Sequence, residues 1–211
     1  QGGLAIACGD AGIGKTQACR QYYREHGTNC IYITVNPCIK SSKSVLELIG
    51  SKLNVSSGSV SRLWLEISSK LSDGMVIIVD EAQHLTRNAI DTLRSLCDCF
   101  DEKGQTLGIC FVGNETTVSR LGGKQKAEFA QIRNRTKNTR FYSVKQIKKS
   151  DIEMLFPDIR EDTTAVEFLL CIAQSPQAIR GAVNLYSNAL DNGNVTAKGL
   201  SAIAKYMDMA V

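Results

Sequence analysis

Two hydrophobic patterns alternate along the first 145 residues. Short apolar runs, typical of buried parallel strands, are separated by stretches in which apolar positions have helical spacing. The runs predict strands at Leu4–Cys8, Cys30–Val35, Met75–Val79, Leu107–Val112 and Arg140–Val144. The stretches between them predict helices at Lys15–His26, Lys43–Leu53, Arg62–Leu71 and Asn88–Phe100, with a Ser/Gly-rich loop at Ser56–Ser61. This alternation predicts an α/β fold with a parallel sheet.

The last of these helices has the clearest pattern. Leu93, Leu96, Cys97 and Phe100 are spaced i, i+3, i+4 and i+7. Positions with this spacing share one face of a helix, so we expect that face to be buried against the sheet.

The strand pattern stops after Val144. The rest of the chain predicts four helices, at Ser150–Phe156, Thr163–Gln174, Gln177–Leu190 and Ala197–Met207. We expect Ser150 to cap the first of them, and Pro176 to open the third, where proline is tolerated. The sequence therefore predicts an α/β core at residues 1–145 and a small helical domain at residues 146–211.

Composition limits the class of protein. Of the 211 residues, 43% are hydrophobic and 22% are charged, which is typical of a globular protein and excludes a mainly disordered one. The longest apolar runs are far shorter than the roughly 20 residues of a membrane span, and no signal peptide opens the chain. The eight cysteines include no C-x-x-C pair, which favours reduced cytosolic thiols over a zinc site. The chain lacks an initiator Met and begins almost directly in a strand pattern, so we expect a fragment without its N-terminal domain.

Positive charge is concentrated in one segment. Residues 120–149 contain ten basic residues and one acid, a net charge of +9. The whole chain carries +4, so the remainder carries −5. A basic segment in an otherwise acidic chain suggests a polyanionic partner, although a solvated basic surface would have the same composition.

A phosphate-binding motif follows the first predicted strand and opens the first helix. Residues 9–16, Gly-Asp-Ala-Gly-Ile-Gly-Lys-Thr, match the pattern G-x-x-x-x-G-K-[ST]. Backbone N–H groups at a glycine-rich helix start bind anions. We expect Lys15 to neutralise the β- and γ-phosphates of ATP and Thr16 to hold Mg²⁺. The predicted nucleotide-binding residues are Gly9, Asp10, Ala11, Gly12, Ile13, Gly14, Lys15, Thr16 and Gln17.

Two acids end the third predicted strand. Asp80 is expected to hold Mg²⁺, and Glu81 to orient and polarise the attacking water. An acid at the second position argues for ATP hydrolysis rather than binding alone. The polar amide of Asn114, at the tip of the next strand, would also lie near the γ-phosphate, although asparagine is a common turn former there. His84 has no partner histidine, and we interpret it as structural.

These motifs together resemble the AAA+ ATPases. Within them, the chain is similar to the family of bacteriophage Mu transposition protein B and its prophage relatives. Besides the phosphate loop, the resemblance rests on Ile77–Leu85, Val112–Asn114, Gly122-Gly123 with residues 127–130, and Ile172–Arg180. It covers nearly the whole chain. It implies a P-loop AAA+ core with a parallel five-stranded sheet, followed by an all-helical lid.

The resemblance also implies roles for single residues. Asn114 would be the first sensor of the γ-phosphate, and Arg180 the second sensor, in the lid. Arg135 would be the arginine finger that reaches the ATP of a neighbouring subunit, with Arg133 as the alternative. For each of the three arginines, surface charge or a DNA contact remains the other interpretation.

The implied function is ATP-dependent, non-specific binding of double-stranded DNA in transposition. Members of this family select target DNA, activate the transposase and assemble as filaments on DNA, and they carry an N-terminal helix-turn-helix domain. The partners would be duplex DNA, a transposase and further copies of the chain in a filament or ring, with no membrane, in the cytoplasm of a bacterial host. We expect Arg120, Lys124 and Lys126 to contact DNA phosphates, because their loop contains paired glycines and no acid.

One segment departs from the family. The helix at residues 61–71 is strongly basic in the Mu protein, but here it has only two cations, Arg62 and Lys70, with Glu66 between them. Contact of this helix with DNA is therefore not expected. Three other functions stay open: another AAA+ helper, such as an insertion-sequence transposase partner or a replication loader; a secretion-associated AAA+ ATPase without a DNA partner; and a nucleotide-gated binding module with negligible turnover.

Overall fold

The computed structural model describes residues 2–117 and 136–209. The chain divides into two compact units. The first contains residues 1–8 and 15–141, and the second contains residues 9–14 and 142–211.

The first unit is built on a parallel sheet. Within the described ranges the sheet has five strands in the order β2-β3-β4-β1-β5. β3 pairs in parallel with both β2 and β4, and β4 also pairs in parallel with β1. The strands are β1 (Gly3–Gly9), β2 (Cys30–Thr34), β3 (Met75–Asp80), β4 (Leu107–Gly113) and β5 (Thr136–Tyr142). The predicted α/β fold with a parallel sheet is confirmed.

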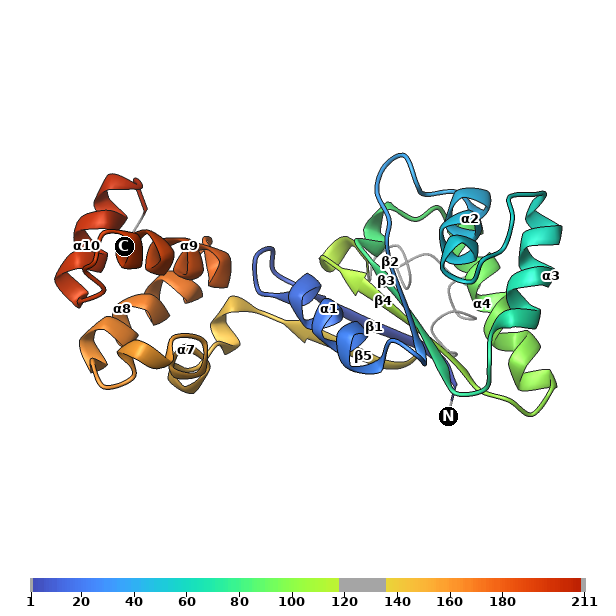
Figure 1. Ribbon diagram of the computed structural model, residues 1–211, viewed down its shortest axis with the longest axis horizontal. Helices are drawn as coiled ribbons and strands as arrows, with labels where there is room; N and C mark the ends of the chain where they lie inside the picture. The colour runs from blue at the N-terminus through green and yellow to red at the C-terminus, as the bar shows by residue number, and fades with distance from the viewer. Residues whose placement is uncertain (1, 118–135, 210–211) are drawn as a thin grey trace. The chain divides into compact units, whose positions relative to one another are not determined.

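Helices cover both faces of the sheet (Figure 1). One face of β3 carries Met75, Ile77 and Val79, which belong to a core shared with α2, α3 and α4. The opposite face carries Val76 and Ile78, in a smaller cluster with Cys19 of α1. Burial on both faces explains why the central strands are continuously apolar rather than alternating. The helices are α1 (Lys15–His26), α2 (Ser42–Lys52), α3 (Val60–Lys70) and α4 (Arg87–Glu102).

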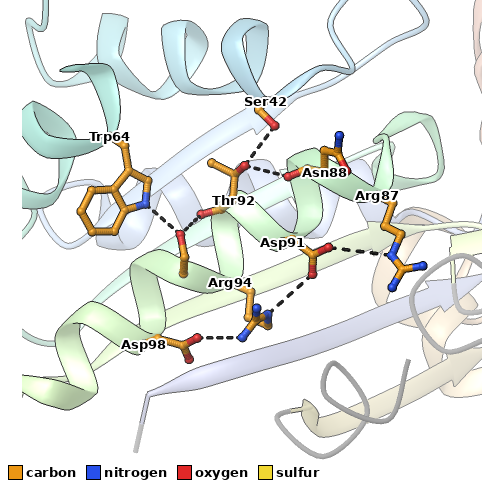
Figure 2. Close-up of polar contacts among 9 residues, drawn as sticks. Ser42, Trp64, Arg87, Asn88, Asp91, Thr92, Arg94 and Asp98 are labelled. Atoms are coloured by element: carbon orange, nitrogen blue, oxygen red, sulfur yellow. Dashed lines mark hydrogen bonds and ion pairs between the residues drawn. The ribbon is translucent and has the colours of Figure 1, made fainter. Parts of the chain in front are cut away.

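Polar contacts join α2, α3 and α4 on one face of the sheet (Figure 2). The indole N–H of Trp64 in α3 donates to Ser95 Oγ in α4 at 2.9 Å, and Thr92 Oγ1 donates to Ser42 Oγ in α2 at 3.0 Å. Arg94 donates to Asp98 one turn further along α4, at 2.7 Å. The predicted buried face of α4 is confirmed, because Leu93, Leu96, Cys97 and Phe100 are all buried.

An open groove lies where α3 and α4 meet. It has a volume of about 710 Å³ and is lined by Val60, Ser61, Trp64, Leu65, Thr92 and Ser95. None of these lining residues is a predicted site residue.

The fifth strand begins and ends earlier than predicted. We expected Arg140–Val144, but β5 spans Thr136–Tyr142, and Val144 begins the short 3-10 helix η2 (Val144–Gln146). Six of the seven β5 residues are exposed, so the strand has no apolar run to reveal it. Ser143 follows the strand as the N-cap of η2, and its Oγ accepts a hydrogen bond from the backbone N–H of Lys145.

The second unit is helical in its described part after Tyr142. Its core contains Ile152, Leu169, Leu185 and Leu200, all inaccessible to solvent. After η2 come α7 (Lys149–Leu155), the 3-10 helix η3 (Pro157–Ile159), α8 (Thr163–Gln174), α9 (Ala178–Asp191) and α10 (Ala197–Tyr206). The four predicted helices agree with α7 to α10 to within one residue at each end.

Two details of helix initiation differ from the prediction. Ser150 does not cap α7; Lys148 is the N-cap, and its backbone N–H donates to the Asp151 carboxylate at 2.8 Å. Pro176 precedes the N-cap of α9, Gln177, rather than lying in the helix. In the ranges that the structure describes, no helix is both long enough and apolar enough to span a membrane.

Candidate functional site

The predicted magnesium ligands come together on the α1 face of the sheet. Thr16, in the first turn of α1, donates from Oγ1 to Asp80 Oδ2 at 2.8 Å. Asp80 is only 1% exposed, and it faces α1 because it shares the strand face of Val76 and Ile78. A carboxylate and a hydroxyl at this distance are oxygen ligands of the type that Mg²⁺ binds.

Tyr32 is a further member of this cluster that the sequence did not indicate. It lies on β2 next to β3, and its hydroxyl donates to Asp80 Oδ2 at 2.9 Å. It in turn accepts a hydrogen bond from Thr34 Oγ1 at 3.1 Å. Tyr32 is protonated near neutral pH and can donate to Asp80, and burial raises its pKa further above its ordinary value. Such a contact fixes the orientation of a metal-binding carboxylate.

Glu81 follows Asp80 in an uncommon backbone conformation. Its φ of 59° and ψ of 33° are left-handed, which is rare for a residue other than glycine. Glu81 is the N-cap of the 3-10 helix η1 (Ala82–His84), but its side chain does not cap that helix. Its carboxylate instead accepts a hydrogen bond from the side-chain amide of Gln83. Strained backbone of this kind is concentrated at functional sites.

Asn114 follows β4 and begins a helical turn. Its Oδ1 accepts hydrogen bonds from the backbone N–H of Thr116 at 3.0 Å and from Thr116 Oγ1 at 2.6 Å. The amide oxygen therefore has the turn-forming role that was the alternative to a sensor. The side-chain nitrogen is the atom with which a sensor would donate to phosphate. His84 is half-buried in η1.

Four of the predicted nucleotide-binding residues lie at the start of α1 or in the loop before it. Lys15 is the first residue of α1 and is half-buried, and Gln17 is exposed on the same helix. In the loop, Ala11 is exposed and Gly14 has a φ of 101°. This positive φ strongly favours glycine, so the local backbone conformation explains why the motif has glycine at this position.

The second unit holds the phosphate loop at Gly9 and Asp10. A Cβ on Gly9 would lie 2.1 Å from the carbonyl oxygen of Tyr142, so no larger residue fits there. The Asp10 carboxylate accepts hydrogen bonds from Ser143 Oγ at 3.0 Å and from the backbone N–H of Val144 at 2.8 Å. These contacts fix the loop to the connection between β5 and η2.

Further along the loop, Gly12 contacts the start of α9. The carbonyl oxygen of Gly12 accepts a hydrogen bond from the backbone N–H of Arg180 at 3.0 Å. A Cβ on Gly12 would lie 3.3 Å from the Cβ atoms of both Ala178 and Arg180. Ala178 is buried with a φ of 56°, and Ile13 packs against the helical core. The structure thus brings the predicted second sensor, Arg180, beside the phosphate loop within one unit.

Five predicted site residues lie outside the described residues. They are the expected DNA contacts Arg120, Lys124 and Lys126, the finger Arg135, and its alternative Arg133.

All eight cysteines are free thiols. Cys19 of α1, Cys30 of β2 and Cys110 of β4 lie in and around the apolar cluster under α1. Burial raises the pKa of Cys19 to about 12, and that of Cys30 and Cys110 to about 11. In the described part of the chain, no group of three His, Cys, Asp or Glu residues is arranged to hold a metal ion.

Comparison with known sequences places the chain among ATPase-like proteins. A family profile described as an AAA domain matches residues 1–121, more than half of the chain. The ATP-dependent target DNA activator B of Escherichia phage Mu is 30% identical over 204 residues, which cover 93% of this chain and 61% of that protein. The Mu-like prophage FluMu DNA transposition protein B of Haemophilus influenzae is 29% identical over 194 residues, covering 87% and 64%. The chain therefore spans less than two thirds of the length of these homologues.

Solved structures with low sequence identity share the fold. The RuvB Holliday junction branch migration motor of Thermotoga maritima has a TM-score of 0.60 at 17% identity, over 97% of this chain and 61% of that chain. Cdc6p of Pyrobaculum aerophilum has a TM-score of 0.66 at 18% identity, over 92% and 57%. These similarities identify the α/β AAA+ fold, with its sheet order 2-3-4-1-5 followed by C-terminal helices.

Proposed function

We propose that this chain, which belongs to the AAA domain family, binds ATP with Mg²⁺ and hydrolyses it. The observation that carries the proposal is the contact between Thr16 and Asp80, with Glu81 directly after Asp80. A helix-start hydroxyl beside a strand-end carboxylate is the arrangement that holds Mg²⁺ in P-loop ATPases.

Each residue of the proposed site has a chemical role. Backbone N–H groups of residues 9–14 and the start of α1 bind the phosphates, and the Lys15 ammonium offsets their charge. Glu81 orients the attacking water and accepts its proton. Asn114 and Arg180 donate to the γ-phosphate as first and second sensors. Mg²⁺, when bound, neutralises charge that develops on the phosphate oxygens.

The sequence relatives suggest the process that this ATPase serves. Two of them carry names that denote target DNA activation and DNA transposition in phages or prophages. We propose that this chain likewise binds duplex DNA without sequence preference, selects it as a transposition target and activates a transposase. Its place would be the cytoplasm of a bacterial host.

We further propose that the active site is shared between subunits of a filament or ring. Arg135, with Arg133 as the alternative, would reach the ATP of the neighbouring subunit. The proposed organisation is a nucleotide-binding core at residues 1–145 and a lid at residues 146–211.

Duplex DNA tests the proposed function. We expect DNA to stimulate phosphate release by the wild type. We also expect Lys15→Ala to lose nucleotide binding, because the charge that offsets the phosphates is absent.

Lys124→Ala with Lys126→Ala should weaken DNA binding. This double variant should also flatten the slope of log affinity against log salt by up to about 2, at about 0.9 per phosphate contact.

The matched control is Lys198→Ala with Lys205→Ala, which removes the same charge from exposed positions of α10. We expect this variant to keep the wild-type salt slope. Equal slopes for the two double variants would place the DNA contacts elsewhere. Phosphate release that DNA leaves unchanged, without measurable DNA binding, would contradict the DNA function and leave the ATPase proposal standing.

A further inference from the structure

The Glu81 carboxylate is held by a side chain that the proposed mechanism does not use. Gln83 donates from its amide nitrogen, Nε2, to Glu81 Oε2. A carboxylate can only accept hydrogen bonds, so the nitrogen end of the amide must face Glu81. The oxygen end of Gln83 then faces away from Glu81 and is available as an acceptor.

That oxygen meets Thr117, beyond the end of β4. Thr117 Oγ1 donates to Gln83 Oε1 at 3.4 Å. Thr117 is fully buried, and its backbone N–H donates to the carbonyl oxygen of Asn114 at 2.9 Å. Two side-chain contacts therefore link Glu81 to the turn that Asn114 begins.

The end of β4 leaves space for this link. A Cβ on Gly113 would lie 2.2 Å from Thr117 Oγ1 and 2.3 Å from Gln83 Oε1. No real Cβ makes contacts this short, and Thr117 is buried, so any residue other than glycine would force these two side chains apart. The absence of a side chain at Gly113 is thus a requirement of the contact between Gln83 and Thr117.

We propose that Gln83 and Thr117 are positioning residues for ATP hydrolysis, which tie the Glu81 carboxylate to the segment carrying Asn114. The proposal rests on the assignment of Glu81 as the residue that activates water. Gln83 holds one carboxylate oxygen and leaves the other, Oε1, to accept the proton of the attacking water. A shift of the turn at Asn114 would reach Glu81 through Thr117 and Gln83, so the contact with γ-phosphate and the orientation of the base would be coupled.

Variants of matched size isolate the hydrogen bonds from packing. Gln83→Met keeps the length of the side chain and removes both polar ends. Thr117→Val keeps the branched shape and removes the hydroxyl, whereas Thr117→Ser keeps the hydroxyl. For each variant, phosphate release at saturating ATP gives kcat, and binding of a fluorescent ATP analogue gives Kd.

Loss of positioning should lower kcat and leave binding unchanged. We expect Gln83→Met to lower kcat by about 10- to 100-fold, the range that a misplaced catalytic group can cost, with Kd within about twofold of wild type. Thr117→Val should act in the same direction, and Thr117→Ser should restore most of the activity. An unchanged kcat in Gln83→Met, or an equal loss of kcat and binding, would overturn the positioning role.

A second readout does not depend on ATP hydrolysis. In ¹⁵N-correlated NMR spectra of the whole chain, Thr117→Val should shift the side-chain amide resonances of Gln83 and the backbone resonance of Glu81, and Thr117→Ser should leave them near their wild-type positions. If the wild type releases no phosphate, the proposed ATPase function fails, and these shifts alone decide whether the link exists. Resonances of Gln83 and Glu81 that stay in place in Thr117→Val would overturn it.

Discussion

At the scale of single residues, the thiols beneath α1 are kept protonated by their surroundings. Cys19, Cys30 and Cys110 share an apolar environment, and burial raises their pKa values to about 12, 11 and 11. Thiols react as thiolates, so low accessibility and high pKa act together against modification. Cys38 and Cys171 are exposed and provide an internal comparison.

Alkylation of the folded protein tests this environment. At pH 8, iodoacetamide should label Cys38 and Cys171 and leave Cys19, Cys30 and Cys110 unlabelled, as peptide mass spectrometry would reveal. The raised pKa values also make the stability of the fold depend on pH. The contribution of the three buried thiols to the free energy of unfolding is fully present below the ordinary thiol pKa of 9.0. It is lost as pH rises through 11 to 12, because the thiols of the unfolded chain release their protons at lower pH than those of the folded chain. Rapid labelling of Cys19 at pH 8 would contradict the buried position.

At the scale of elements, the phosphate loop depends on the connection after β5. Asp10→Ala removes the acceptor of two hydrogen bonds, from Ser143 Oγ and from the backbone N–H of Val144. We expect the free energy of unfolding to fall by roughly 1–3 kcal/mol, at about 0.5–1.5 for each bond. Urea titration measures the loss, and Asp10→Asn, which keeps a side-chain oxygen, should lose less. Equal stability of Asp10→Ala and wild type would show that these bonds do not hold the loop.

The same elements show how far sequence patterns could predict the fold. β1 to β4 were located from apolar runs because both faces of the sheet are covered, so nearly every position is apolar. β5 was misplaced because six of its seven residues are exposed and give no such signal. The helices α7 to α10 were found because each buries one face in the helical core.

At the scale of the whole molecule, the site divides into parts that sequence could and could not predict. The phosphate motif and the Asp80-Glu81 pair are consecutive residues, and their chemistry follows from adjacency alone. Tyr32 meets Asp80, and Thr117 meets Gln83, only because β3 lies between β2 and β4. Spacing along the chain does not encode strand order, so these contacts required the structure.

We propose above that the chain is an ATPase in which Glu81 activates water. The most direct test measures phosphate release and ATP binding together for the wild type, Glu81→Gln and the control Glu102→Gln, whose exposed acid lies at the end of α4. We expect equal ATP binding in all three proteins and phosphate release at the wild-type rate in the control. Release by Glu81→Gln should be lower by about 10²- to 10⁴-fold, because the amide keeps the shape and loses the base. Phosphate release by Glu81→Gln at the wild-type rate would contradict it.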